Sequence, residues 1–237
     1  MKFTRIIQFY KKNAFLYTLQ ILAFIGILVT GIVYKQQALR IIPLFVSLIV
    51  MFLQSNVNRF NFLLGGINSA FYAIAYFSME LYSQAIYALL FSLPLQIISF
   101  VNWNKKADGY STKLLKMPNK YRALLFTGVA IVWASVCLIY YFPLNYQEKE
   151  LTSIIKMLLD NVTTVFGIVA TILMMLRFIE YAPLQITGLV SSLFIYFVML
   201  PTEPRQITFI IYTVYALICS VIAIRNMKKR YRAQQLN

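Results

Sequence analysis

The chain has 237 residues, of which 60% are apolar and 12% charged, and its mean hydropathy is +0.71. Soluble domains average about 45–50% apolar and about 25% charged residues, so this composition excludes an ordinary soluble domain and predicts an all-α polytopic membrane protein in contact with the lipid bilayer. The formal net charge is +15, and because the basic residues fall between apolar runs we attribute it to membrane topology and expect no nucleic-acid partner.

Eight apolar runs are long enough to cross a bilayer, which takes about 18–25 residues. In chain order they are Ala14–Tyr34, Leu39–Val57, Phe60–Met79, Leu81–Val101, Tyr121–Phe142, Ser153–Leu176, Tyr181–Leu200 and Gln206–Ile224. The two longer connections are Asn102–Lys120 and Pro143–Thr152. The connections after the second, third, sixth and seventh runs are very short, so the runs that they join are expected to be antiparallel and adjacent.

Basic residues predict how these runs are oriented, because Lys and Arg accumulate on the cytoplasmic side. With eight alternating spans, the side that holds both termini carries all but five of the 22 basic residues. The five on the opposite side are Lys35, Arg40, Lys149, Lys156 and Arg205. We therefore predict a multi-pass membrane protein with both termini in the cytoplasm.

A weak internal repeat divides the runs into two groups of three. Arg59-Phe60 is echoed by Arg177-Phe178, and the inner ends VNWNKK and IRNMKKR resemble each other. The predicted architecture is an extra helix at 14–34, a first repeat at 39–101, a linking helix at 121–142 and a second repeat at 153–224. An odd linker between odd repeats makes them parallel, which in transporters places the substrate between the repeats.

Several kinds of chemistry are missing. There is no histidine, and Cys137 and Cys219 lie inside apolar runs, where they are expected to pack and not to form a disulfide. No phosphate-binding loop, nucleophile elbow or cysteine-rich metal pattern occurs. We therefore expect no metal, no cofactor and no enzymatic activity. The first apolar run lacks a small-residue cleavage site and is expected to remain as a span.

The stretch Leu93–Lys106 holds the strongest candidates for substrate contact. Gln96 lies inside an apolar run, and Pro94 removes a helix hydrogen bond two residues earlier. We expect these two residues to form a binding and bending point. Asn102 and Trp103 follow at the cytoplasmic end and are predicted to form the floor of the pathway. A second Pro-Leu-Gln occurs at Pro183–Gln185. There Pro183 is interpreted as a first-turn proline, and the recurrence of the tripeptide as a coincidence.

Asn68 is a second candidate, because it lies in the middle of an apolar run behind Gly65 and Gly66. A buried amide needs a partner, water or a ligand. Two explanations stay open: an interhelical hydrogen bond where the glycines let helices approach closely, or contact with substrate. Six aromatic residues lie too deep for an interface belt and either pack or stack on a flat ligand: Tyr72, Tyr76, Tyr87, Phe91, Tyr212 and Tyr215.

The sixth run offers polar candidates at both ends. Asp160, near its outer end, is either an exposed acid favoured by the start of a helix or a cation-attracting group at the mouth of the pathway. Thr164 is a weaker candidate, since a hydroxyl can bond to its own helix. Arg177 and Glu180, three residues apart at the inner end, are expected to form an ion pair if the helix continues.

These residues together resemble a known family. The block Asn58–Asn68 (NRFNFLLGGIN), the entry Glu80–Ala85 (ELYSQA), the block Pro94–Trp103 and the series Asp160, Ile168–Met174, Arg177 and Glu180 resemble the PnuC family in order and spacing. The resemblance covers residues 39–230. It implies a nicotinamide riboside transporter of the bacterial plasma (inner) membrane, with an architecture related to the SWEET sugar transporters. Three positions where the family commonly has tryptophan hold Phe100, Ala182 and Gln185.

The resemblance implies facilitated diffusion of a vitamin nucleoside, trapped by phosphorylation in the cytoplasm. The residues expected to bind the substrate are Gln96, Asn68, Asn102 and Trp103 from the first repeat and Asp160 and Thr164 from the second. Relatives that carry thiamine, riboflavin or deoxynucleosides are the alternative. A substrate-capture subunit of an ATP-driven importer and a membrane-embedded enzyme are less favoured, and a homo-oligomer is possible.

Overall fold

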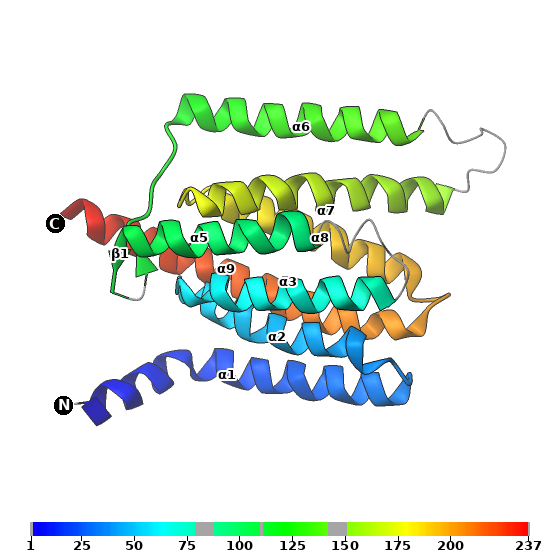
Figure 1. Cartoon of the computed structure of the whole chain (residues 1–237), viewed down its shortest axis with the longest axis horizontal. Coiled ribbons are helices and arrows are strands. Elements are labelled where there is room, and N and C mark those ends of the chain that lie inside the picture. The colour runs from blue at the N-terminus through cyan, green and yellow to red at the C-terminus, as the bar shows by residue number, and fades with distance from the viewer. Residues whose placement is uncertain (1, 79–87, 110, 142–150, 237) are drawn as a thin grey trace.

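The structure is a computed structural model in which residues 2–78, 88–109, 111–141 and 151–236 are described. The long helices in chain order are α1 (Lys2–Val33), α2 (Ala38–Ser55), α3 (Phe60–Ser78), α5 (Leu93–Lys105), α6 (Asn119–Tyr141), α7 (Leu151–Met175), α8 (Tyr181–Met199) and α9 (Ile207–Leu236) (Figure 1). A π-helical turn, η1 (Ala88–Ser92), leads into α5, and a 3₁₀ turn, η3 (Pro204–Gln206), precedes α9. The motif at Glu80–Ala85, Tyr87 and most of the Pro143–Thr152 connection lie outside the described residues.

The surface of this helical bundle is apolar. Among the described residues, six helices are long and apolar enough to cross a bilayer, and α3 adds a shorter apolar stretch, Phe60–Ile74. Large side chains point outward, with Ile32 69% and Leu124 68% exposed. Backbone groups in lipid must be bonded within the segment, which the helices achieve. The chain is therefore a multi-pass membrane protein, whereas the count of eight spans stays a prediction.

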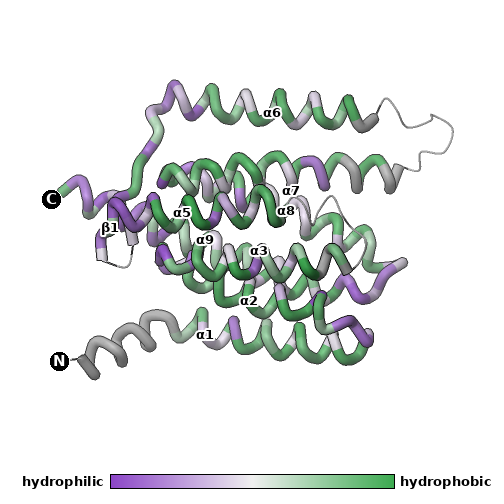
Figure 2. Tube along the Cα trace, in the orientation of Figure 1, coloured by the Kyte–Doolittle hydropathy of each residue, from purple (hydrophilic) through white to green (hydrophobic). Residues whose placement is uncertain are grey.

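Polar residues gather at the ends of the helices (Figure 2). Both termini lie at the same end of the bundle (Figure 1). Helix α9 extends to Leu236, twelve residues beyond the predicted run, because hydropathy marks only the apolar part of a helix that continues through Arg225 and its basic neighbours. A small hairpin, β1 (Ala107–Asp108) with β2 (Ser111–Thr112), follows α5 at this end.

Two matching turns end α2 and α7. Val57 and Arg177 both have a left-handed backbone, with φ of 54° and 68°. The Val57 N–H donates to the Gln54 carbonyl (2.8 Å), as the Arg177 N–H does to the Met174 carbonyl (3.0 Å). The N–H of the next residue also donates a hydrogen bond, from Asn58 to the Leu53 carbonyl and from Phe178 to the Leu173 carbonyl. This is the pattern of a Schellman cap. These turns make Val57 the structural counterpart of Arg177. The sequence repeat instead suggested Arg59 as the counterpart, which lies two residues further along the chain.

The end of α7 corrects two expectations. The helix stops at Met175, so Arg177 and Glu180 are not on one continuous helix, and the ion pair found among the described residues is Arg205–Glu203. Arg177 instead donates to the Lys113 carbonyl (3.3 Å). Helix α7 begins at Leu151, which places Asp160 about 13 Å inside it. Free N–H groups are confined to the first turn, so the helix-start explanation for Asp160 is wrong.

Candidate functional site

A first pair of buried amides joins α2 to α8. Gln54 and Gln185 exchange side-chain hydrogen bonds, with a Gln54 Nε2 to Gln185 Oε1 distance of 2.5 Å and a reverse distance of 3.4 Å. The Tyr181 hydroxyl, one helical turn from Gln185, is hydrogen-bonded to the Gln54 side chain. Gln54 is 4% exposed and Tyr181 1%. Polar groups inside a bilayer are costly unless partnered, so this layer marks an interior that is not lipid-facing.

A second polar layer lies two helical turns from the first, toward the N-terminal end of α2. The Asn68 Nδ2 donates to the Ser47 hydroxyl at 2.7 Å, and the Tyr212 hydroxyl of α9 is hydrogen-bonded to the same Ser47 side chain. Ser47 and Gln54 are seven residues apart and so share one face of α2, about 10 Å apart along its axis. The Asn68 side chain is 7% exposed, and its Oδ1 has no hydrogen-bond partner among the described residues. An unpaired buried acceptor is available to a ligand hydroxyl or amide.

Both layers connect the group α2, α3 and α5 with the group α7, α8 and α9. Their amides and hydroxyls offer donors and acceptors to a polar molecule between these groups. The sequence analysis singled out Asn68 but missed Ser47, Gln54 and Tyr181, and it treated the recurrence at Gln185 as a coincidence. The signal available in the sequence was the spacing of polar residues within apolar helices. Ser47 and Gln54 are seven residues apart on α2, and Tyr181 and Gln185 are four apart on α8, so each pair shares one helix face.

Gln96 packs against the glycines of α3. A Cβ built on Gly65 would lie 2.9 Å from Gln96 Oε1, and one on Gly66 would lie 3.7 Å from the Gln96 Cβ. Gln96 is half-buried on α5, where Pro94 occupies the first turn directly after the π-helical turn η1. Ser92 is itself helical, with φ −64° and ψ −49°, so η1 runs directly into α5, and Pro94, which has no N–H to donate, lies at this junction of π- and α-helix.

The remaining predicted residues lie at other levels. Trp103 is 1% exposed, and its Nε1 donates to the Met174 carbonyl (2.8 Å) while its ring meets Phe62 edge-on at 4.7 Å. Asn102 is half-buried beside it, and Asp160 and Thr164 are exposed on one face of α7. From Met174 to Asp160 the span is about 20 Å. No hydrogen bond of the described residues joins two of the six predicted site residues, so the structure does not bring them together as one cluster.

At the end of the bundle that holds both termini, the connection between α5 and α6 is bonded to the α7–α8 turn and to α9. The Leu115 N–H donates to the Arg177 carbonyl (2.9 Å), and the Ile179 N–H donates to the Leu115 carbonyl (3.0 Å). Glu180 Oε1 accepts the Met117 N–H at 3.1 Å. Gln234 of α9 holds the same connection by bonding to Leu114 N and the Thr112 carbonyl. The α7–α8 turn is thus fastened to the connection, directly below Trp103 and Met174.

Gly65 provides a test of how tightly Gln96 is held. We expect Gly65→Ala to lower the melting temperature in detergent relative to Gly66→Ala, because only the former forces Gln96 to move. Both substitutions gain about 1 kcal/mol of helix propensity, so the difference reports the contact, and it should stay below about 1 kcal/mol because the flexible end of the Gln96 side chain can move aside. Combining Gly65→Ala with Gln96→Ala should restore stability. Equal melting temperatures for the two glycine variants would contradict this placement of Gln96.

Comparisons with known proteins agree with the resemblance. A family model described as nicotinamide mononucleotide transporter matches residues 37–228. A nicotinamide riboside transporter PnuC from Neisseria mucosa is 31% identical over 125 residues, which is 51% of this chain. That match spans only 44% of the relative's length. The crystal structure of the vitamin B3 transporter PnuC superposes with a TM-score of 0.69 at 20% identity over 92% of each chain, which shows a shared fold.

Proposed function

The chain belongs to the nicotinamide mononucleotide transporter family, also represented by PnuC, and from this premise we propose that it carries nicotinamide riboside across the membrane by facilitated diffusion. The observation that carries the proposal is the pair of polar layers, at Gln54–Gln185 and at Ser47–Asn68, inside an otherwise apolar bundle. Nicotinamide riboside joins a flat cationic ring to a polar ribose. Amides and hydroxyls suit the ribose, and the unpaired Asn68 Oδ1 suits a hydroxyl donor.

The other predicted residues receive roles along the path. Asp160 and Thr164, exposed on α7, are proposed to attract the cation at the outer mouth. Gln96 is proposed to contact substrate next to the Gly65 face of α3. Asn102 and Trp103 are proposed to form the inner floor, which opens when the substrate leaves. The burial of Trp103 and its bond to Met174 support a closed inner end.

We further propose the parallel three-plus-one-plus-three architecture and alternating access between its halves. The matching caps at Val57 and Arg177 support it. Reciprocal bonds also support it: Trp103 of α5 donates to the Met174 carbonyl at the end of α7, and Asn226 of α9 donates to the Ser55 carbonyl at the end of α2 (2.7 Å). In each case the third helix of one half is tied to the inner end of the first helix of the other.

The orientation is proposed from charge. Both termini and most basic residues fall at the same end, and the positive-inside rule places that end in the cytoplasm. In this orientation Trp103 and the connection between α5 and α6 form the cytoplasmic closure. Cytoplasmic phosphorylation then keeps the imported nucleoside from returning.

Uptake into liposomes tests this proposal. With purified protein and radiolabelled nicotinamide riboside, we expect the internal concentration to rise to the external value and no higher. A phosphorylating kinase with ATP enclosed in the liposomes should produce accumulation. Liposomes with protein heated before reconstitution are the control. Accumulation above the external concentration without kinase, driven by a proton or sodium gradient, would contradict facilitated diffusion.

A second candidate is the same transport activity with another vitamin or nucleoside. Ala182 and Gln185 occupy positions where the resemblance leads us to expect tryptophan, and Gln185 is held by Gln54. With fewer aromatic side chains to stack on a flat ring, the site would favour a ligand that makes more hydrogen bonds than nicotinamide riboside does. A melting-temperature panel with nicotinamide riboside, thiamine, riboflavin and deoxynucleosides separates these substrates, because a ligand that binds the folded state stabilises it.

A further inference from the structure

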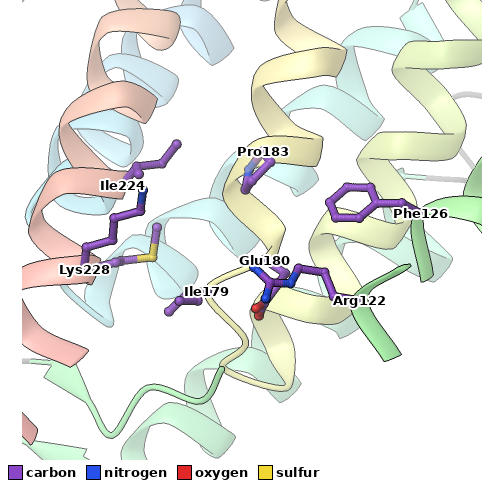
Figure 3. A pocket seen from close by; sticks show the side chains of 8 residues that line it. Arg122, Phe126, Ile179, Glu180, Pro183, Ile224 and Lys228 are labelled. Atoms are coloured by element: carbon purple, nitrogen blue, oxygen red, sulfur yellow. The ribbon is translucent and has the colours of Figure 1, made fainter. Parts of the chain in front are cut away.

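A cleft lies between the inner ends of α6, α8 and α9, away from the polar layers described above. One part of it has a volume of about 280 Å³ and is lined by Arg122, Phe126, Ile179, Glu180, Pro183, Ile224, Met227 and Lys228 (Figure 3). A neighbouring part of about 350 Å³ shares Arg122, Ile179 and Lys228 and adds Lys116, Tyr231 and Arg232. Helix α6 runs beside α7 at the edge of the bundle, and only 11% of its apolar span is buried, so lipid surrounds this cleft.

Four cations border the cleft. Arg122 donates to Asn119 Oδ1 and lines the cleft, where Figure 3 labels it together with Glu180 and Lys228. Lys116, Lys228 and Arg232 come from the connection and from α9. Among the described residues none of the four forms an ion pair. Their combined charge favours an anion.

Glu180 supplies an independent observation. It is 3% exposed and lines the cleft, and while its Oε1 accepts the Met117 N–H, its Oε2 has no partner in the described part of the chain. A buried carboxylate oxygen without a donor is costly. A ligand for this cleft therefore offers a hydrogen-bond donor close to its anionic group.

The depth of the lining residues identifies the ligand class. Phe126 and Ile224 lie inside the apolar parts of α6 and α9, whereas Lys116 precedes the start of α6 and Arg232 lies in the polar last turns of α9. A phospholipid has the same order, with acyl chains in the core and phosphate at the surface. We propose that the cleft binds an anionic phospholipid whose headgroup carries a hydroxyl: the phosphate meets Arg122 and Lys228, the hydroxyl donates to Glu180 Oε2, and an acyl chain lies along Phe126 and Ile224.

Lipid binding to delipidated full-length protein, followed by native mass spectrometry, tests the cation half of this site. The double variant Arg122→Gln/Lys228→Gln should bind phosphatidylglycerol about 25-fold more weakly, since each cation near an anionic headgroup contributes roughly fivefold. The matched control is Lys120→Gln/Lys229→Gln, which removes the same charge from the same two helices outside the cleft lining. If the first variant fails to fold, Lys116→Gln/Arg232→Gln replaces it. Equal weakening in test and control variants overturns the proposal.

Two further arms test the headgroup. Phosphatidylmethanol carries the same charge without a hydroxyl, and we expect it to bind about 10-fold more weakly than phosphatidylglycerol to the wild type. Glu180→Gln keeps an acceptor for the Met117 N–H but replaces the charged acceptor Oε2 by a neutral N–H₂ group, so that preference should fall. Glycerol 3-phosphate at matched concentration should not raise the melting temperature. Stabilisation equal to that by phosphatidylglycerol would instead identify a free-phosphate site, and absence of the headgroup preference in the wild type would remove the role of Glu180.

Discussion

Replacing Gln185 by leucine is expected to lower the initial rate of nicotinamide riboside uptake at least about tenfold. Gln185 and Gln54 satisfy each other across the α2–α8 contact, and Gln54 is 4% exposed. Removing Gln185 leaves the buried Gln54 amide with the Tyr181 hydroxyl as its remaining partner among those described, and the loss of the paired bonds costs about 1–3 kcal/mol. A proposed ligand contact between the two halves is lost at the same time. Uptake into liposomes at equal protein content and melting in detergent measure the two effects separately.

The double variant Gln54→Leu/Gln185→Leu separates folding from transport. Replacing both partners of a buried hydrogen bond by apolar groups is close to neutral, so stability should recover relative to Gln185→Leu, apart from the cost of the buried Tyr181 hydroxyl, which loses its Gln54 partner. Uptake should stay low, because leucine offers the substrate neither donor nor acceptor. If the stable double variant transports at the wild-type rate, the Gln54–Gln185 layer is a structural link and the path lies elsewhere.

The helices were largely predictable because hydropathy is a local property. The predicted run Tyr181–Leu200 and the observed Tyr181–Met199 differ by one residue, since the turn before α8 and the polar loop after it both break the pattern. Features that depend on backbone geometry were not predictable in this way. The π-helical turn η1 and the left-handed residue that ends α7 leave no mark in hydropathy.

The candidate site was only partly predictable. Asn68 stands out in an apolar run, but its partner Ser47 does not, because small hydroxyls are common in membrane helices and usually bond to their own backbone. Which faces of α2, α3 and α9 meet is decided by packing between distant segments. The same holds for Gln54, whose role is visible only once α8 brings Gln185 to it. Single residues were therefore found more readily than pairs.

Trp103→Ala is expected to cause the largest loss of stability among the substitutions considered, about 3–5 kcal/mol, as for a buried large aromatic residue. The side chain is 1% exposed, packs on Phe62, and fastens α5 to the Met174 carbonyl of α7. Trp103→Phe keeps most of the packing and removes the N–H, so it should cost only about 1 kcal/mol. Unfolding in detergent, followed by far-ultraviolet circular dichroism, measures both variants.

Asn226→Ala isolates the hydrogen-bond part of this effect. Asn226 ties α9 to the Ser55 carbonyl, as Trp103 ties α5 to Met174, but without a large aromatic surface. Its loss should therefore match that of Trp103→Phe, at about 1 kcal/mol, and the excess cost of Trp103→Ala should equal the packing against Phe62. If Trp103→Ala instead kept wild-type stability and lost the stabilisation by nicotinamide riboside, the indole would face the ligand, and the inner closure would have to rest on the connection between α5 and α6 alone.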